Sequence, residues 1–229
     1  MQAVILAAGM GERLMPLTEN KTKAMVEVAG TPMIFRTLDS LAKLDQVSEA
    51  IIVIGHQGDS LKESVGESYQ GIKITYVENG QYAETNNIYS LWLAKDLIND
   101  DFILLEGDIV FEPEILKMLI GGGGNKALVS KFNEDWMDGA VVSLDAQNKI
   151  KRLISKVDQE ADFDFSGKFK TLNIYSFELE FYHQHLKPGL EFYVKTAGKF
   201  NYYEVLFGAL THLGVYLEGK IVEDSTWFE

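Results

Sequence analysis

The chain has 229 residues, of which 46% are hydrophobic, and a formal net charge of −13. This length and apolar content can form the core of one large domain, whereas the negative charge argues against an extended nucleic-acid surface, because binding a phosphate backbone needs clustered lysine and arginine. The chain has no cysteine, which excludes disulfides, thiolate metal sites and a cysteine nucleophile, so that a cytoplasmic location is the default expectation.

Short apolar runs alternate with helical patterns in the first half of the chain. The runs that we interpret as buried strands span residues 3–6, 50–56, 72–77 and 102–106. The stretches whose apolar residues have helical spacing span residues 33–44, 59–68 and 87–98. This alternation predicts an α/β fold with a Rossmann-like, mainly parallel sheet that binds its ligands at the carboxyl ends of its strands.

The pattern changes after the glycine-rich stretch at residues 121–125, which we interpret as a loop within one domain that spans residues 1–229. The segments that follow and are typical of strands span residues 126–132, 139–145 and 170–177. We therefore expect a β-rich second half that closes over one end of the sheet. The N-terminal apolar stretch is too short to cross a bilayer and lacks the basic region of a secretion signal, so no membrane partner is expected.

The most informative loop is "LAAGMGERLMPLTENKTKAM", residues 6–25. It is not a dinucleotide fingerprint, because the position of the third glycine holds Leu14, and it is not a Walker A loop, because neither glycine precedes a lysine. Gly9 and Gly11 alone fit an ordinary turn equally well. In the other interpretation, the backbone N–H groups of this loop approach a nucleotide, and the side chains of Arg13 and Lys23 fold back over its phosphates.

A second candidate lies in "LLEGDIVFEP", where Asp108 follows an apolar strand. A carboxylate at the carboxyl end of a parallel strand faces the ligand crevice, where its oxygen can hold Mg²⁺ on a triphosphate. By itself, an aspartate at this position is also typical of a turn or a helix cap.

Together with "AIIVIGH", "YAETNNIYSLWLA" and "LLEGDIVF", the opening loop resembles the signature of the sugar-nucleotide and cytidylyl nucleotidyltransferases. The resemblance implies a fold of the glycosyltransferase-A-like type, phosphate contacts and catalytic roles for Arg13 and Lys23, and Asp108 as a ligand of Mg²⁺. The nucleotide-binding residues that it implies are Leu6, Ala7, Ala8, Gly9, Gly11, Tyr82, Thr85, Asn86, Asn87 and Ser90. Thr85 or Asn86 also fits the N-cap of the following helix.

The stretch "NGQYAETNNIYSLWLA" is similar to cytidylyltransferases that activate aminoalcohol phosphates or aminoalkyl phosphonates. The segments "DWMDGAVV", "KTLNIYSF" and "YYEVL" resemble the branch that acts on 2-aminoethylphosphonate more than the phosphocholine branch. The implied reaction transfers CMP from CTP to this acceptor and yields a CDP-type adduct and pyrophosphate.

An ammonium group of the acceptor can be surrounded by aromatic faces and carboxylates. Tyr203 is one such aromatic residue, although any single aromatic residue is also typical of ordinary packing. The other acceptor-binding residues that the resemblance implies are Trp136, Asp138, Lys170, Asn173, Tyr202 and Glu204.

Three alternatives stay open, a phosphocholine cytidylyltransferase, a sugar-1-phosphate nucleotidyltransferase and a nucleotide-sensing binding module without chemistry. The family's second metal-binding aspartate would lie beyond Glu229, and Asp224 lies on the wrong side of Trp227 to replace it. We therefore expect the chain to be the N-terminal part of a longer polypeptide, such as a fusion to a transaminase.

Overall fold

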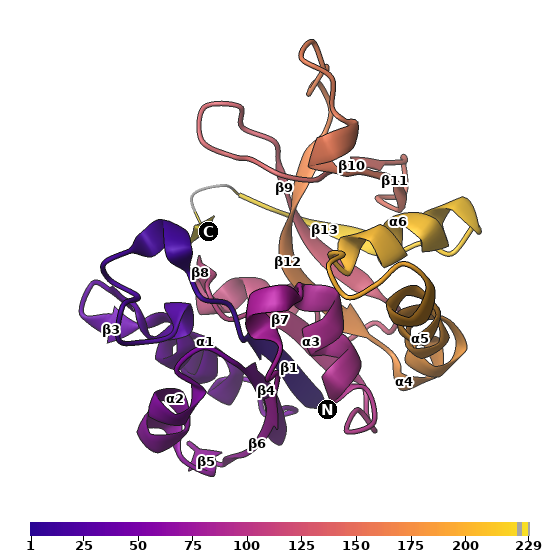
Figure 1. The fold of residues 1–229 in the computed structure, drawn as a ribbon. Helices are drawn as coiled ribbons and strands as arrows, with labels where there is room; N and C mark the ends of the chain where they lie inside the picture. Colours follow the sequence, from indigo (N-terminus) through magenta and orange to yellow (C-terminus); the bar gives the residue numbers. More distant parts are fainter. Residues whose placement is uncertain (224–225, 229) are drawn as a thin grey trace.

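The computed structural model describes residues 1–223 and 226–228, in which one ten-stranded sheet dominates (Figure 1). Asp224 lies outside the described residues. The strands of this sheet are β1 (Gln2–Ala7), β4 (Glu49–Ile54), β5 (Ser68–Tyr69), β6 (Ile72–Glu78), β7 (Phe102–Glu106), β9 (Lys126–Lys131), β10 (Val141–Leu144), β11 (Ile150–Ile154), β12 (Phe169–Phe177) and β13 (Glu218–Val222). Two short pairs complete the β-structure, β2 (Glu27–Val28) with β3 (Thr31–Pro32) and β8 (Val110–Phe111) with β14 (Trp227–Phe228).

The strand order is β11-β10-β12-β7-β1-β4-β6-β5, and β9 pairs with both β12 and β13. The neighbours β7, β1, β4 and β6 run parallel to one another, so their carboxyl ends meet at one edge of the sheet. β12 from the second half of the chain runs antiparallel to β7 from the first half. The two halves of the chain therefore share one sheet, and the second half reaches the edge at which β1 and β7 end.

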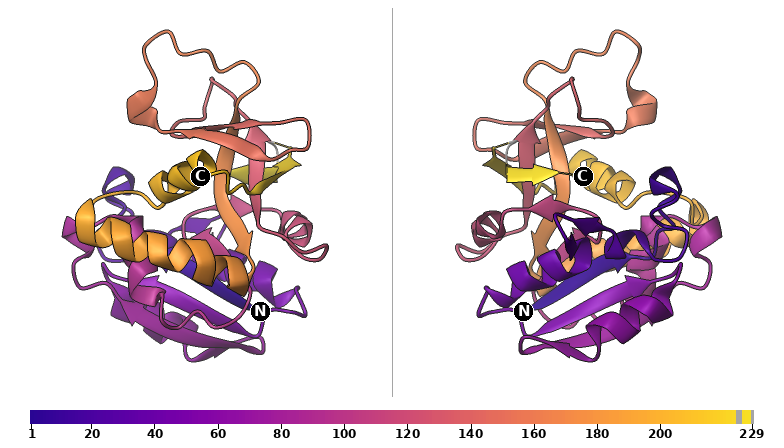
Figure 2. Two further views of the ribbon diagram at one scale, coloured as in Figure 1. Left: turned by 90° about the vertical axis from the view of Figure 1, so that its right-hand side faces the viewer. Right: turned by 90° about the vertical axis from the view of Figure 1, so that its left-hand side faces the viewer.

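Helices cover both faces of the sheet. They are α1 (Met33–Ala42), α2 (Gly58–Val65), α3 (Asn87–Ala94), α4 (Leu179–Phe181), α5 (Lys187–Thr196) and α6 (Glu204–His212), and a π-helix, Tyr182–Leu186, joins α4 to α5. Because side chains alternate along β1, Ile5 lies in the core that α1 and α2 cover, and Val4 lies in the core that α3, α5 and α6 cover. Figure 2 shows α5 in front of the sheet in the left view, and α1 and α2 in the right view.

The predicted α/β fold is confirmed, and each predicted strand and helix is present with modest changes at its ends. The helix from Asn87 ends at Ala94 rather than at residue 98, and turns follow it. The helix predicted over 59–68 ends at Val65, because Gly66 adopts a φ of 77°. Among the described residues, no helix has the length and apolar content needed to cross a membrane.

The sequence analysis did not identify the helices between β12 and β13. Pro188 and Gly189 are typical of a turn, but in the structure both lie in the first turns of α5. A Cβ atom on Gly189 would lie 2.4 Å from Leu206 of α6, so the close contact between these two helices requires glycine. Tertiary packing thus selects a helix where the local sequence suggests a break.

Candidate active site

The edge at which β1 and β7 end brings Lys23 and Asp108 together. Lys23 Nζ forms an ion pair with the Asp108 carboxylate across 85 positions of the chain. The side chains are 25% and 19% exposed, so the pair is partly covered by protein and still reaches solvent. The Gly107 N–H donates to the Leu6 carbonyl at 2.9 Å and ties the two strand ends together. Lys23 and Asp108, the cation and the carboxylate that the sequence analysis assigned to a triphosphate, are therefore in direct contact.

The opening loop folds back onto the end of β1. Gly11 has a φ of 66°, and a Cβ atom there would lie 2.9 Å from the Cβ atom of Lys23. Thr18 Oγ1 donates to the Gly11 carbonyl at 2.9 Å, and Thr22 Oγ1 donates to the Ala7 carbonyl at 3.3 Å. Glycine at position 11 thus allows the turn to pack directly against the lysine stem.

The other residues of the opening loop differ in what they present to a ligand. Arg13 is exposed on a 3₁₀ turn, Glu12–Leu14, and Gly9 is exposed with no other atom within 4 Å of the position of a Cβ. The side chains that are buried in the core, so that only their backbone can contact a ligand, are Leu6, Ala7 and Ala8.

Gly55, at the end of β4, contributes to this edge and was missed by the sequence analysis. A Cβ atom on Gly55 would lie 2.7 Å from the Ala8 carbonyl oxygen and 2.7 Å from the Cβ atom of Tyr82. The Tyr82 ring lies edge-on to the His56 ring, with 5.8 Å between the ring centroids. A side chain at position 55 would push the opening loop and Tyr82 apart. The glycine directly after a buried strand was the sequence signal that could have identified this position.

Asn79 organises the segment that precedes α3, and the sequence analysis missed it because Asn-Gly resembles a plain turn. Its side chain is buried and donates to Thr85 Oγ1 at 3.0 Å and to Ser90 Oγ at 3.2 Å, and its Oδ1 accepts from the Gln81 N–H at 3.0 Å. The hydroxyl groups of Thr85 and Ser90 thus both bond to one amide.

Asn86 and Asn87 hold the start of α3. Asn86 is the N-cap, and its Oδ1 accepts from the Asn87 N–H at 2.9 Å, which confirms the capping interpretation. Asn87 Nδ2 donates to Glu106 Oε1 at 2.8 Å, and Asn87 Oδ1 accepts from the Tyr203 N–H at 2.9 Å. The start of α3 is therefore bonded to the end of β7 and to the start of α6.

Glu106 is the electrostatic centre of this corner. Burial, followed by the charges of Asp108 and Glu204, raises its pKa to about 8, and the hydrogen bond from Asn87 opposes the rise. Burial also raises the pKa of the Tyr203 phenol well above its usual value, with Glu106 as the next cause. Glu204, predicted at the acceptor, thus lies in the electrostatic neighbourhood of the end of β7.

Trp136 packs against the C-terminal strand. Its ring centroid lies 5.3 Å from that of Trp227 and 6.1 Å from that of Phe228. Trp227 pairs with Phe111 in the β8–β14 ladder, and β8 begins two residues after Asp108. Trp136 is 42% exposed, so one part of its indole packs and another part faces solvent near this end of the sheet.

The tyrosines at the start of α6 are in opposite environments. Tyr202 is 57% exposed, whereas Tyr203 is fully buried and packs against Phe207 with 5.3 Å between ring centroids. The described ring contacts place Tyr203 in the core and Trp136 beside β14, and none of them joins the two groups into one aromatic cage.

Asp138 and Lys170 lie together in the second half. Lys156 Nζ lies 2.5 Å from Asp138 Oδ2, and this hydrogen bond lowers the pKa of Asp138, with smaller contributions from the Gly139 N–H and the charge of Lys170. Lys170 is buried, and its Nζ lies 3.4 Å from where a Cβ atom on Gly139 would be. Lys156 was not predicted, because a lysine in a polar loop is usually solvated.

Asn173 marks an irregularity in β12. Its φ is 56°, and its Oδ1 accepts from Thr171 Oγ1 at 3.2 Å and from the Tyr175 hydroxyl at 3.4 Å. The register between β12 and β9 shifts between Thr171 and Tyr175, so Asn173 lies at a bulge. The orientation of the Asn173 side chain is thus fixed by hydrogen bonds from Thr171 and Tyr175 on the same strand.

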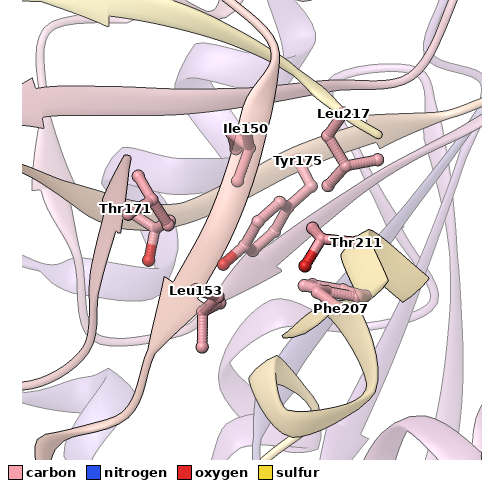
Figure 3. Close-up of a pocket in the computed structure, with 8 residues that line it drawn as sticks. Ile150, Leu153, Thr171, Tyr175, Phe207, Thr211 and Leu217 are labelled. Atoms are coloured by element: carbon pink, nitrogen blue, oxygen red, sulfur yellow. The ribbon is translucent and has the colours of Figure 1, made fainter. Parts of the chain in front are cut away.

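Two cavities lie away from the predicted residues. One, of about 10 Å³, is enclosed by β11, β12 and α6, and Figure 3 shows Leu153, Tyr175 and Phe207 around it; this volume holds at most about one water molecule. The other is an open apolar groove of about 780 Å³ beside α5 and α6, which includes Phe192 and Leu213. Neither is lined by a predicted site residue. The candidate site at the edge of the sheet is identified instead by the contact between Lys23 and Asp108.

The donor set at this edge suits a metal that is shared with a substrate. Among the described residues, no group of three or more His, Cys, Asp or Glu side chains can hold a metal ion by itself. Asp108 offers one partly exposed carboxylate, and Mg²⁺ is typically held by one or two carboxylates together with phosphate oxygens of a substrate. Asp108 therefore fits the role of a single protein ligand.

A family profile described as nucleotidyl transferase matches residues 2–197. The chain is 33% identical over all of its 229 residues to the CMP-5'-(3-aminopropyl)phosphonate synthase of Streptomyces rubellomurinus, covering 36% of that protein. It is 37% identical over 115 residues to the choline-phosphate cytidylyltransferase of Streptococcus pneumoniae, which is 49% of this chain and 47% of that protein. The aligned segments thus cover between a third and a half of the length of these curated relatives.

A solved structure of CTP:phosphocholine cytidylyltransferase from Streptococcus pneumoniae has the same fold. It superposes with a TM-score of 0.78 at 22% identity and covers all of this chain and 92% of the other. The parallel strands and the loop after β1 fit this fold, and the family profile matches residues 2–197, which is most of the chain. The chain therefore belongs to the nucleotidyl transferase family.

Proposed function

We propose that the chain is a CTP-dependent cytidylyltransferase that transfers CMP to a small zwitterionic acceptor, 2-aminoethylphosphonate, and releases pyrophosphate. The contact between Lys23 and Asp108 supports the proposal, because a cation and a carboxylate lie together at the carboxyl ends of the parallel strands, where folds of this kind bind their ligands. The relative that matches the whole chain is named for an aminoalkyl phosphonate linked to CMP, which supports the phosphonate class of acceptor.

The reaction is a direct displacement at phosphorus. A phosphonate oxygen of the acceptor attacks the α-phosphorus of CTP, a new P–O bond forms, and the bond to the leaving pyrophosphate breaks. The nucleophile is already an anion, so no covalent enzyme intermediate is required, and the protein contributes alignment and charge neutralisation. Lys23 and Arg13 offset the negative charge of the transferring and leaving phosphates.

Members of this family generally use a divalent metal ion, and we propose Mg²⁺ held by Asp108. When bound, the ion supplies charge neutralisation on the triphosphate. Because Lys23 contacts the same carboxylate, Asp108 positions both the lysine ammonium group and the proposed metal ion. The backbone of the Gly9–Gly11 loop and the polar groups of Tyr82, Thr85, Asn86 and Ser90 form the proposed nucleotide side of the site.

The acceptor is proposed to bind on the side of the second half of the chain. Lys156 and Lys170 lie around Asp138 and carry the positive charge that a phosphonate group requires. Trp136 and Tyr202 have exposed aromatic surface, and Glu204 supplies a carboxylate, so each of them offers a group of a kind that can contact an ammonium group. Asn173 completes the proposed set beside Lys170 on β12.

The test is a pyrophosphate-release assay with each of the four nucleoside triphosphates and a panel of acceptors. The panel contains 2-aminoethylphosphonate, 3-aminopropylphosphonate, phosphocholine, phosphoethanolamine and glucose 1-phosphate, and a Lys23→Ala variant controls for contaminating activity. We expect the highest kcat/KM with CTP and 2-aminoethylphosphonate.

Other outcomes of this panel identify the alternatives. Preference for phosphocholine would favour the activity named for the pneumococcal relative, and preference for glucose 1-phosphate would favour a sugar-nucleotide enzyme. Tight CTP binding without pyrophosphate release from any acceptor would contradict the enzymatic proposal and favour a nucleotide-sensing module.

A further inference from the structure

Asn87 lies where three segments of different origin meet. These are the end of β7, the start of α3 and the start of α6, and the amide of Asn87 bonds to the other two at 2.8 Å and 2.9 Å. We infer that Asn87 is a positioning residue that sets the distance between the nucleotide side and the acceptor side of the site. This inference rests on the proposed function for what the two sides bind, but not for the connection itself.

The chemistry of this position requires an amide. The Tyr203 N–H can only donate, so the atom of Asn87 that faces it is the oxygen, and the amide nitrogen then faces the Glu106 carboxylate, which accepts. Aspartate can accept from Tyr203 but cannot donate to Glu106, and leucine of similar size can do neither. Both atoms of Asn87 that carry hydrogen-bonding chemistry are thus used within the protein.

Independent contacts hold the same two segments together. The Asn86 N–H donates to the Lys199 carbonyl at 2.8 Å, and Lys199 Nζ donates to Gln81 Oε1 at 2.9 Å. Lys199 Nζ also lies 4.4 Å from the centroid of the Tyr89 ring. The segment 199–204 therefore contacts the segment 81–89 at several positions. Of these contacts, the one at Asn87 also bonds to the end of β7.

The segment 199–204 carries Tyr202 and Glu204, which we place on the acceptor side, and Asp108 follows Glu106 by two residues. A shift at Asn87 therefore moves the acceptor side relative to the metal-binding carboxylate and leaves the loop at Gly11 in place. The defect should therefore fall more heavily on acceptor use and turnover than on the affinity for CTP.

The experiment reverses the polarity of one hydrogen bond. Asn87→Asp replaces the N–H donor to Glu106 with a second carboxyl group, and adding Glu106→Gln restores an N–H donor between the two side chains, with donor and acceptor exchanged. Asn201→Asp is the matched control, since Asn201 is in the same segment and its side chain bonds to Ala197 in its own stretch of chain. The readouts are kcat and KM for the acceptor, CTP affinity by calorimetry, Tm, and hydrogen exchange of the Tyr203 amide.

We expect Asn87→Asp to lower kcat/KM for the acceptor by about 10- to 100-fold, because a displacement near 1 Å has effects of this order. The double variant should recover most of this loss, and Asn201→Asp should behave as the parent protein. Loss of CTP affinity in parallel with acceptor use, or a double variant no better than Asn87→Asp, would overturn the inference.

The connection is also tested without turnover. Asn87→Leu, which removes the acceptor of the Tyr203 N–H, should speed exchange of that amide and lower Tm, whereas the double variant keeps this acceptor and should exchange as the parent protein does. If the parent protein shows no cytidylyl transfer, the proposed function fails while these two measurements still decide the connection. Unchanged Tyr203 exchange in Asn87→Leu would refute it even if the enzyme is active.

Discussion

Replacing Gly11 with alanine separates the cost of its backbone conformation from its contact with Lys23. A Cβ atom at position 11 would lie 2.9 Å from Lys23 Cβ and 3.0 Å from Thr18 Cγ2. Carbon atoms prefer separations of about 3.5 Å or more, so the Lys23 stem must retreat by roughly 0.6 Å, the difference between the two values. Because a 1 Å displacement of a catalytic group can cost about 100-fold, we expect a loss of about tenfold in kcat/KM.

Gly30→Ala is the matched control, because Gly30 also has a positive φ, of 77°, but no atom within 4 Å of the position of its Cβ. Both variants carry the backbone penalty of about 1 kcal/mol, which lowers Tm by about 2–4 °C in a protein of this size. Only Gly11→Ala should lose pyrophosphate release and CTP affinity. Equal kcat/KM values in the two variants would refute the reasoning that Gly11 positions Lys23.

Four further outcomes follow from the structure. Lys23→Ala should lower turnover in the pyrophosphate-release assay by at least about a hundredfold, and normal turnover would contradict its role at the phosphates. Asp108→Asn should abolish both activity and the response to Mg²⁺, so an unaltered metal titration would remove Asp108 as the ligand. Leu38→Ala, at a fully buried position of α1, should lower the free energy of unfolding by about 2–5 kcal/mol in urea denaturation, and a loss below about 1 kcal/mol would mean that this core tolerates a cavity. The hydrogen bond from Lys73 lowers the pKa of Glu49 in the folded state below 4.5, so this bond stabilises the protein above pH 4.5 and the stabilisation is lost as the pH falls through the lowered pKa. Glu49→Gln should therefore reduce the fall in Tm on acidification. An unchanged dependence of Tm on pH would exclude a contribution of Glu49 to acid stability.

The ends of the strands were predicted well because their signals are local. The apolar run before Ala7 and Ala8 specified a buried strand that ends in a loop, and the run before Asp108 did the same for β7. The polar groups before α3 were found, but their partner was missed, because Asn79 in an Asn-Gly pair gives no signal that its amide is buried.

The acceptor side was predicted less well, for a physical reason. Tyr202 and Tyr203 are identical neighbours in sequence, and their burial differs only because α6 turns one ring into the core against Phe207 and the other outward. The helices α5 and α6 were missed because Pro188 suggests a break, and only the contact between Gly189 and Leu206 shows why the chain continues as a helix.

The sequence by itself determined the α/β class, the order of the first strands and helices, and the loop after the first strand that we propose faces a nucleotide, because periodicity and residue spacing act over a few positions. The tertiary structure alone decided that Lys23 meets Asp108 across 85 positions and that Asn87 meets Tyr203 across 116. It also decided that burial beside Asp108 and Glu204 raises the pKa of a single carboxylate, Glu106, to about 8. Contacts and desolvation of this kind depend on which distant segments pack together, and no local pattern of residues encodes that arrangement.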